Sequence, residues 1–402
     1  MKTVAIAGTF DTKGHEYLYI KETFEHMGFK TFTIHTGVFE PKFVPDVSNA
    51  EVANVMDISI DEIRNKKDRA FATEILSKAM EKLIPKLFEE GKFDGIISFG
   101  GTGGTSLVTP AMRALPIGVP KIMVSTVASG NTSQYIGTSD LVMMPSVVDV
   151  SGLNSISLKI FNNAIFAMAV MLSFENVKQV EKKPLIGATM FGVTTPCVDA
   201  AREYLEQRGY EVLVFHATGI GGQSMESLIE SGFIEGVLDL TTTEWADEIV
   251  GGVLGAGPKR LEAAAKNNIP QVVSLGAMDM CNFGSYESVP EKYKTRNLYK
   301  HNPTVTLMRT TVEENRKIGE KIAEKLNLSN GNTTLFIPLK GVSAIDVEGQ
   351  AFYGPEEDKM LFDTVKGLVD KSKIDIVEMD TDINDKAFAE AAAQKLIELM
   401  AK

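Results

Sequence analysis

Residues 93–105 carry the pattern in this chain that is best suited to binding a charged ligand: Phe-Asp-Gly-Ile-Ile-Ser-Phe-Gly-Gly-Thr-Gly-Gly-Thr. A short apolar run is followed by four glycines within five residues, and residues 105–115 can continue as a helix. Glycine lets the backbone approach an anion closely, and free N–H groups at a helix start bind negative charge. Thr102, Thr105 and Ser106 add hydroxyl donors. The pattern predicts a phosphate-binding loop.

Two familiar nucleotide motifs do not match this loop. A Walker A loop would close with Gly-Lys-Ser/Thr, whereas the nearest basic residue downstream is Arg113. A dinucleotide fingerprint would have a third glycine in place of Ser106 and an acidic residue after the next strand, residues 121–125. A dinucleotide-dependent oxidoreductase is therefore disfavoured. The alternative is a tight strand-to-helix turn that needs glycine for its backbone angles alone, although one or two glycines would satisfy that need.

A second polar loop, Thr-Phe-Asp-Thr-Lys-Gly at residues 9–14, follows the first predicted strand. A helix over residues 15–27 and a strand over residues 30–35 complete a βαβ unit. Open α/β sheets bind ligands at the carboxyl ends of their strands, while an ordinary polar helix cap is the equal alternative. The predicted nucleotide contacts in the two loops are Thr9, Asp11, Thr12, Lys13, Gly100, Gly101, Thr102, Gly103, Gly104 and Thr105.

Between these loops the sequence is less regular. Residues 41–68 are predicted to be irregular, with a helix start near Ser48. The charged cluster at residues 66–69 is interpreted as the solvated start of a long helix over residues 70–90.

The second half of the chain repeats the first. A shift of 181 residues places residues 4–35 over residues 185–216 without a gap, and two further matches follow in the same order. Chance similarity of two α/β units is the alternative. The sequence predicts an α/β fold of two Rossmann-like subdomains with parallel sheets, produced by internal duplication. Their predicted ranges are 1–180 and 184–402, joined by a polar linker at residues 176–183.

The two halves differ at residues 100–105, which we call the glycine loop. At the corresponding place the second half has Thr-Thr-Thr-Glu, residues 241–244. Carboxylates with histidine can bind a divalent cation or act as general acid and base, but no zinc spacing is present, and each residue taken singly is more simply structural. Asp247 and Glu248 are expected to be exposed helix residues. The predicted catalytic residues are Asp239 and Glu244, with His216, Asp279, His301 and Asp346 as candidates for a second ligand. The identity of any metal is left open.

Chain length, charge and cysteine content limit the kinds of protein that this chain can be. With 402 residues, the chain is long enough for two or three domains. A formal net charge of −12 argues against nucleic acid as a partner. No signal-peptide pattern and no apolar run of membrane-spanning length is evident, so we expect a cytoplasmic protein that does not enter a membrane. The two cysteines are isolated and indicate no disulfide framework.

Taken together, these motifs resemble the family named after the tomato protein that inhibits replication of tomato mosaic virus. The resemblance spans nearly the whole chain and rests on residues 8–14, 100–105, 216–219, 239–244, 301–303 and 341–346. It implies an ATP-binding protein of two Rossmann-like subdomains and a homodimer, with nucleotide held in the first subdomain. It implies no reaction. Plant members carry an additional C-terminal barrel, so the viral-inhibitor role is not carried over.

The predicted function is a cytoplasmic ATP-binding protein with a second, unknown small molecule in the crevice between the halves. The catalytic hypothesis is Mg-assisted phosphoryl or adenylyl transfer to a small polar metabolite, with Lys13 contacting phosphate. ATP, with Mg²⁺ for the transfer, is the expected cofactor. The alternative is a non-catalytic nucleotide sensor or interaction module.

Overall fold

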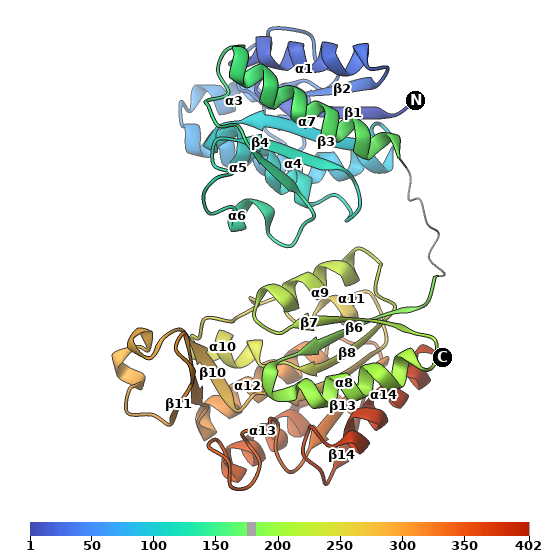
Figure 1. Ribbon diagram of the computed structural model, residues 1–402, viewed down its shortest axis with the longest axis vertical. Helices are drawn as coiled ribbons and strands as arrows, with labels where there is room; N and C mark the ends of the chain where they lie inside the picture. The colour runs from blue at the N-terminus through green and yellow to red at the C-terminus, as the bar shows by residue number, and fades with distance from the viewer. Residues whose placement is uncertain (175–181, 402) are drawn as a thin grey trace. The chain divides into compact units, whose positions relative to one another are not determined.

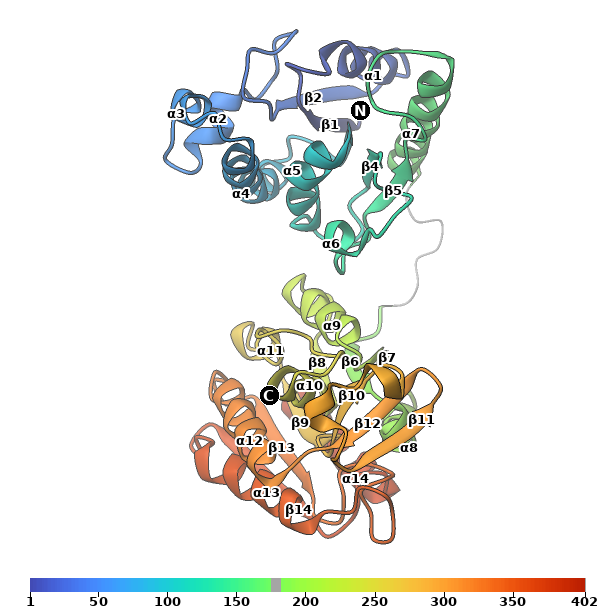
Figure 2. The ribbon, with the colours of Figure 1, turned by 90° about the vertical axis from the view of Figure 1, so that its left-hand side faces the viewer.

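The computed structural model describes residues 1–174 and 182–401 and forms two compact units, Met1–Val180 and Glu181–Lys402. Most of the predicted linker, residues 176–183, falls outside the described residues. The elements of each unit are labelled in Figure 1 and Figure 2.

Unit 1 is built on a five-stranded parallel sheet in the order β2-β1-β3-β4-β5. Three of its strands are buried along almost their whole length, as expected for a parallel sheet covered on both faces. The predicted strands are confirmed, with the last one shorter than expected. The bounds are β1 Thr3–Gly8, β2 Lys30–His35, β3 Gly95–Gly100, β4 Lys121–Ser125 and β5 Val142–Pro145.

Helices cover both faces of this sheet (Figure 2). One face packs against α1 (Gly14–His26) and α7 (Ser155–Ser173), and the other against α2, α4 and α5. The bounds of the remaining helices are α2 Asn49–Asn54, α3 Ile60–Asn65, α4 Arg69–Glu89, α5 Thr102–Arg113 and α6 Ser133–Ile136.

The prediction that residues 41–68 are irregular is wrong for α3. Both short helices in this stretch begin with a capping box, in which Ser48 pairs with Glu51 and Ser59 with Glu62. The Ser-x-x-Glu spacing of each box was present in the sequence as a start signal.

Helix α7 has the length and apolar composition of a membrane span, with a mean hydropathy of 1.5. Its residues Phe161, Ile165 and Met168 belong to the core that covers the sheet. A core helix of a soluble α/β unit passes the same test of length and composition. The structure buries 39% of this apolar stretch, and the buried face, with Phe161, Ile165 and Met168, covers the sheet of unit 1.

Strands β1 and β3 separate toward their carboxyl ends. Their ladder joins residues 4–6 with residues 95–97. Beyond it, the Tyr17 hydroxyl accepts a hydrogen bond from the Phe99 N–H at 3.0 Å and donates one to the Phe99 carbonyl at 2.5 Å. Burial raises the pKa of Tyr17 to about 12, so the hydroxyl keeps the proton that it donates. The tyrosine thus satisfies backbone groups that β1 no longer reaches.

Unit 2 contains a six-stranded parallel sheet in the order β14-β13-β9-β8-β6-β7. Its first four strands in chain order, β6 to β9, are arranged as β1 to β4 are in unit 1, which agrees with the predicted duplication. The bounds are β6 Leu185–Met190, β7 Glu211–His216, β8 Gly236–Thr241, β9 Gln271–Gly276, β13 Thr333–Pro338 and β14 Ile374–Met379.

The strand register corrects the ungapped alignment of the two halves. Gly8 pairs with His35 in unit 1, and Met190 pairs with His216 in unit 2. Gly8 is therefore equivalent to Met190 and His35 to His216, which is a shift of 182 residues in the first strand and 181 in the second. The alignment is one residue out of register over the first strand.

Helices also cover both faces of the second sheet. One face packs against α8 (Thr195–Glu206) and α14 (Lys386–Met400). The remaining helices are α9 Ile220–Glu230, α10 Glu244–Val250, α11 Ala263–Lys266, α12 Val312–Leu326 and α13 Pro355–Leu368. An antiparallel sheet that the sequence did not predict, in the order β10-β12-β11, comprises Met280–Phe283, Val305–Arg309 and Leu298–Asn302.

Candidate functional site

A cavity of about 1250 Å³ lies in unit 1 at the carboxyl ends of β1, β2 and β3. This is the point where the strand order reverses, since β2 lies on one side of β1 and β3 on the other. Open α/β sheets bind ligands at such a point. The cavity wall includes all the predicted nucleotide contacts except Thr105: Thr9, Asp11, Thr12, Lys13, Gly100, Gly101, Thr102, Gly103 and Gly104.

The glycine loop presents the start of helix α5 to this cavity. The helix begins at Thr102, earlier than predicted, so Gly103 and Gly104 lie in its first turn. Gly101 is the N-cap and supplies no side-chain cap. N–H groups of a first turn lack partners within the helix and carry partial positive charge. The cavity wall is therefore suited to an anion.

Thr105 has a different place from the one predicted. It is fully buried, and its hydroxyl contacts the Gly101 carbonyl at 2.9 Å and the Ser125 hydroxyl at 2.6 Å. These two hydrogen bonds connect the glycine loop to β4, and Thr105 does not line the cavity.

Asp11 positions the wall of the cavity. Its Oδ1 accepts a hydrogen bond from the Thr12 N–H at 2.8 Å, and its Oδ2 accepts one from the Phe39 N–H at 3.1 Å. A Cβ atom at Gly37 would lie 2.3 Å from Oδ1, so this close approach requires glycine. Asp11 thus joins the loops that follow β1 and β2. The Lys13 ammonium donates to the carbonyl of Val150.

Arg69, the first residue of α4, is a cavity residue that the sequence motifs did not single out. Its Nη2 lies 3.0 Å from the position of a Cβ on Gly103. Among residues 1–174 and 182–401, its guanidinium has no hydrogen-bond or ion-pair partner. The neighbouring Asp68 caps α4 by accepting from the Ala70 N–H at 2.9 Å. The cluster at residues 66–69, interpreted as solvated, therefore places a free cation beside the glycine loop.

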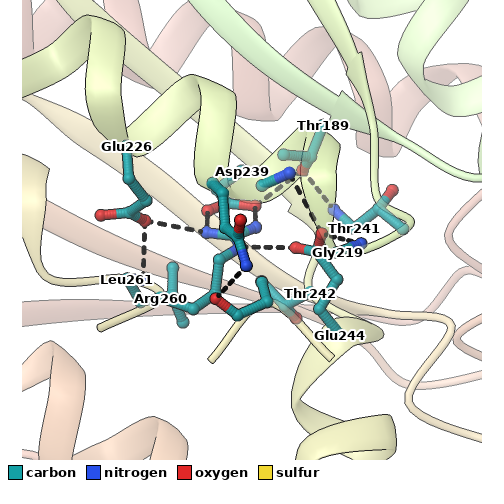
Figure 3. Close-up of polar contacts among 12 residues, drawn as sticks. Thr189, Gly219, Glu226, Asp239, Thr241, Thr242, Glu244, Arg260 and Leu261 are labelled. Atoms are coloured by element: carbon teal, nitrogen blue, oxygen red, sulfur yellow. Dashed lines mark hydrogen bonds and ion pairs between the residues drawn. The ribbon is translucent and has the colours of Figure 1, made fainter. Parts of the chain in front are cut away.

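In unit 2, the predicted catalytic residues Asp239 and Glu244 form a buried ionic cluster around Arg260 (Figure 3). The guanidinium donates to both oxygens of Asp239, at 2.5 and 2.7 Å, and to Oε2 of Glu244 at 2.6 Å. It also donates to Glu226 at 3.2 Å. Burial would penalise any of these charges alone, so the pairing is needed to hold them.

Glu244 also occupies the start of helix α9. Its Oε1 accepts from the Gly219 N–H at 2.7 Å and the Gly222 N–H at 3.1 Å. A Cβ at Gly222 would lie 2.2 Å from Oε2. A carboxylate of the chain itself therefore binds at the helix N-terminus. Every oxygen of Asp239 and Glu244 is engaged, so the arrangement gives both a structural task, and their catalytic role stays a prediction.

Two of the four second-ligand candidates lie in one cluster. Asp346 accepts from Arg309 at 3.1 Å, and Asp279 accepts from the Ser343 hydroxyl at 2.8 Å. Burial raises the pKa of both carboxyls, and their proximity to each other raises that of Asp346 further. His216 and His301 are exposed at β7 and β11, and the described contacts do not bring them into this cluster.

Asp247 is buried, contrary to the expectation of an exposed helix residue. Its Oδ1 accepts from the N–H groups of Leu254 at 3.2 Å and Asn282 at 3.0 Å, and its Oδ2 accepts from the Asn282 amide at 2.6 Å. Burial nevertheless raises the pKa of Asp247 to about 7. The Asn282 Oδ1 has no partner among the described residues.

Replacing Arg260 with leucine should destabilise unit 2 by about 3–5 kcal/mol, because it leaves buried carboxylates unpaired. The control, Arg316→Leu, removes an exposed arginine paired with Glu313 and should cost about 0–1 kcal/mol. Urea unfolding followed through the single, buried Trp245 reports on this unit. Equal losses in the two variants would show that the cluster is not needed for folding.

Asp247→Asn should reduce the pH dependence of stability. The pKa of Asp247 is raised in the folded protein, so the folded state binds more protons than the unfolded state between pH 4 and 7, and stability falls as pH rises through that range. Each tenfold difference in proton affinity between the two states is worth about 1.4 kcal/mol. Asparagine cannot titrate, and its amide can donate to Asn282 Oδ1 once the Asn282 amide has turned over. Urea unfolding at pH 4 to 8 tests this, and an unchanged slope in the variant would contradict it.

Comparison with known proteins agrees with the two-unit architecture. Residues 2–177 match the N-terminal domain, and residues 183–400 the C-terminal domain, of the uncharacterised protein family UPF0261. A UPF0261 protein from Clostridium tetani is 57% identical over the full length of both chains. A second, from Rhizobium meliloti, is 44% identical over 98% of each chain.

A plant relative is longer than this chain. The tomato mosaic virus resistance protein Tm-1 of Solanum lycopersicum is 46% identical over 83% of this chain and 45% of its own length. Among solved structures, the UDP-GlcNAc 2-epimerase of Methanocaldococcus jannaschii covers 68% of this chain and 83% of its own, with 11% identity and a TM-score of 0.23. A likeness that weak supports no statement on function. The two domain matches and the full-length bacterial relatives establish that this chain belongs to the UPF0261 family.

Proposed function

We propose that unit 1 binds a nucleoside triphosphate, with ATP as the first candidate, in the cavity at the carboxyl ends of β1, β2 and β3. The observation that carries this proposal is that the uncapped start of α5 and the unpaired guanidinium of Arg69 lie on the same cavity wall. Both groups attract anions, for independent reasons. Their combination favours a phosphate chain over an uncharged ligand.

The glycines make room for that phosphate chain. A Cβ at Gly104 would meet no atom within 4 Å, so the space in front of this residue is open. Backbone N–H groups of the first turn can then approach a phosphate oxygen closely. Lys13, which also lines the cavity, supplies a further cation.

Phosphoryl or adenylyl transfer needs groups that hold the metal or the acceptor, and we assign no residues to these roles. The expected reaction gave Asp239 and Glu244 the task of holding metal or acceptor, but their oxygens accept hydrogen bonds from Arg260 and neighbouring groups. No group of three or more His, Cys, Asp or Glu side chains suited to a metal ion occurs within the described parts of the chain. We therefore propose nucleotide binding and assign no reaction. Because Mg²⁺ on a nucleotide needs only one or two carboxylates beside the phosphates, Mg-assisted transfer and a non-catalytic sensor both stay predictions. A homodimer stays a prediction of the family resemblance, and a cytoplasmic location stays a prediction from the sequence.

The test is a calorimetric titration of ATP into the full chain and its variants. Gly104→Val should abolish binding because its side chain fills the open space, and Arg69→Ala should weaken binding about 10- to 100-fold through the loss of charge-assisted hydrogen bonds. Gly367→Val is the matched control, because Gly367 also lies in a helix, α13, with no atom within 4 Å of its Cβ position.

Wild-type affinity in Gly367→Val would show that a valine at an open helical position outside unit 1 does not change ATP binding. Wild-type affinity in Gly104→Val would contradict the proposed site, and so would the absence of ATP binding in the wild type.

A further inference from the structure

The loop after β2, residues 36–39, forms the part of the cavity wall on the other side of β1 from the glycine loop. Neighbouring strands lie about 4.8 Å apart, and β1 and β3 part beyond their ladder, so the ends of β2 and β3 are separated by at least about 10 Å. This separation matches the reach from the phosphates to the nucleoside within one nucleotide. The two loops can therefore contact different parts of a single ligand.

Four side chains hold the backbone of this loop. His35 Nδ1 accepts from the Phe10 N–H, so its Nε2 carries the proton and donates to the Phe39 carbonyl at 2.9 Å. Three further side chains complete the set. Asn49 donates to the Gly37 carbonyl at 2.8 Å, Arg64 donates to the Val38 carbonyl at 2.9 Å, and Asp11 accepts from the Phe39 N–H at 3.1 Å. The loop is thus fixed before any ligand arrives, which lowers the entropy cost of binding.

The fixed loop presents an exposed aromatic ring. The Phe39 side chain is 57% exposed although its backbone is anchored, and it lines the cavity. The cavity wall also includes the apolar side chains of Ile63, Leu76 and Leu107. A ring beside an apolar wall is suited to stacking on a flat aromatic base.

Thr36 is the second observation that points to a ligand. It lines the cavity, is 1% exposed, and its hydroxyl has no hydrogen-bond partner among residues 1–174 and 182–401. An unpaired buried hydroxyl costs stability, and such groups in native proteins call for an explanation. A rotation of about 120° around χ1 moves the threonine hydroxyl into the position that the methyl group or the Cβ hydrogen held before. The hydroxyl oxygen is itself buried, so it faces the cavity only after such a rotation, and there it can pair with a ribose hydroxyl or a ring nitrogen.

We propose that the nucleoside half of the ligand lies against residues 36–39, with its base on Phe39 and a polar group hydrogen-bonded to Thr36. The phosphates then lie at α5 and Arg69. This inference rests on the proposed function and adds the orientation of the nucleotide and two residues that determine its specificity.

The experiment compares ATP with inorganic tripolyphosphate in calorimetric titrations of the full chain. Thr36→Val should weaken ATP binding about tenfold, and Phe39→Ala should weaken it about tenfold or more. The affinity for tripolyphosphate should stay unchanged in both variants. Thr36→Ser keeps the hydroxyl and is the matched control, with expected wild-type affinity for ATP.

Folding of Thr36→Val is checked by thermal unfolding without nucleotide. Because valine has nearly the same shape and removes an unpaired polar atom, the melting temperature should not fall. A loss of ATP affinity in this variant is then a direct effect on binding.

Two results would overturn the inference while leaving the proposed function intact: wild-type ATP affinity in both Thr36→Val and Phe39→Ala, or an equal loss of ATP and tripolyphosphate affinity. Failure of the wild type to bind either ligand would instead overturn the proposed function, and the inference with it.

Discussion

The geometry of unit 1 depends on the separation of two neighbouring parallel strands. β1 and β3 pair over their first residues and then part, because β1 leads toward β2 on one side and β3 toward β4 on the other. The Tyr17 hydroxyl satisfies the Phe99 backbone where the ladder ends. This single bridge lets the strands part without leaving buried polar groups unpaired. The glycine loop, the loop at residues 9–13 and the loop after β2 all border the space that results.

The second unit has the same arrangement of its first four strands, but different side chains lie at the carboxyl ends of these strands. There, β8 leads into residues 241–244, and the side chain of Glu244 binds at the start of α9. Arg260 joins this carboxylate to Asp239. An internal ionic cluster thus takes the place that a ligand could take at a sheet edge of this kind.

Periodicity and turn signals predicted most of the fold. The strands of both parallel sheets follow from apolar runs that end in glycine or polar loops, and the resemblance between halves predicted that the two units share one architecture. β11 could not be predicted in this way, because the strand is mostly exposed and polar and its pairing depends on residues far away in sequence. The one-residue shift between β1 and β6 also became visible only in the strand register.

Some residues of the candidate site could be singled out from the sequence and others could not, for a physical reason. Loop position and glycine content indicate which loops border a cavity at the strand ends, so the loops at residues 9–13 and 100–104 could be placed there. Whether a carboxylate is free to bind a ligand depends on the side chains that pair with it. Arg260 pairs with Asp239 and Glu244 and lies 16 residues or more away from them in sequence. In the sequence, nothing distinguished Arg69 from a solvated charged residue at the start of a helix. Thr36 and Phe39 carry no motif, and only burial and the anchored backbone single them out.

The central claim is that nucleotide binds in the cavity of unit 1, and hydrogen exchange of the full chain with and without ATP tests it most directly. Exchange reports local opening of the backbone. The account predicts slower exchange with ATP at residues 9–13, 36–39 and 100–107, and unchanged exchange around Asp239, Glu244 and Arg260. Protection confined to unit 2, or no protection at these three segments when ATP is bound, would contradict it.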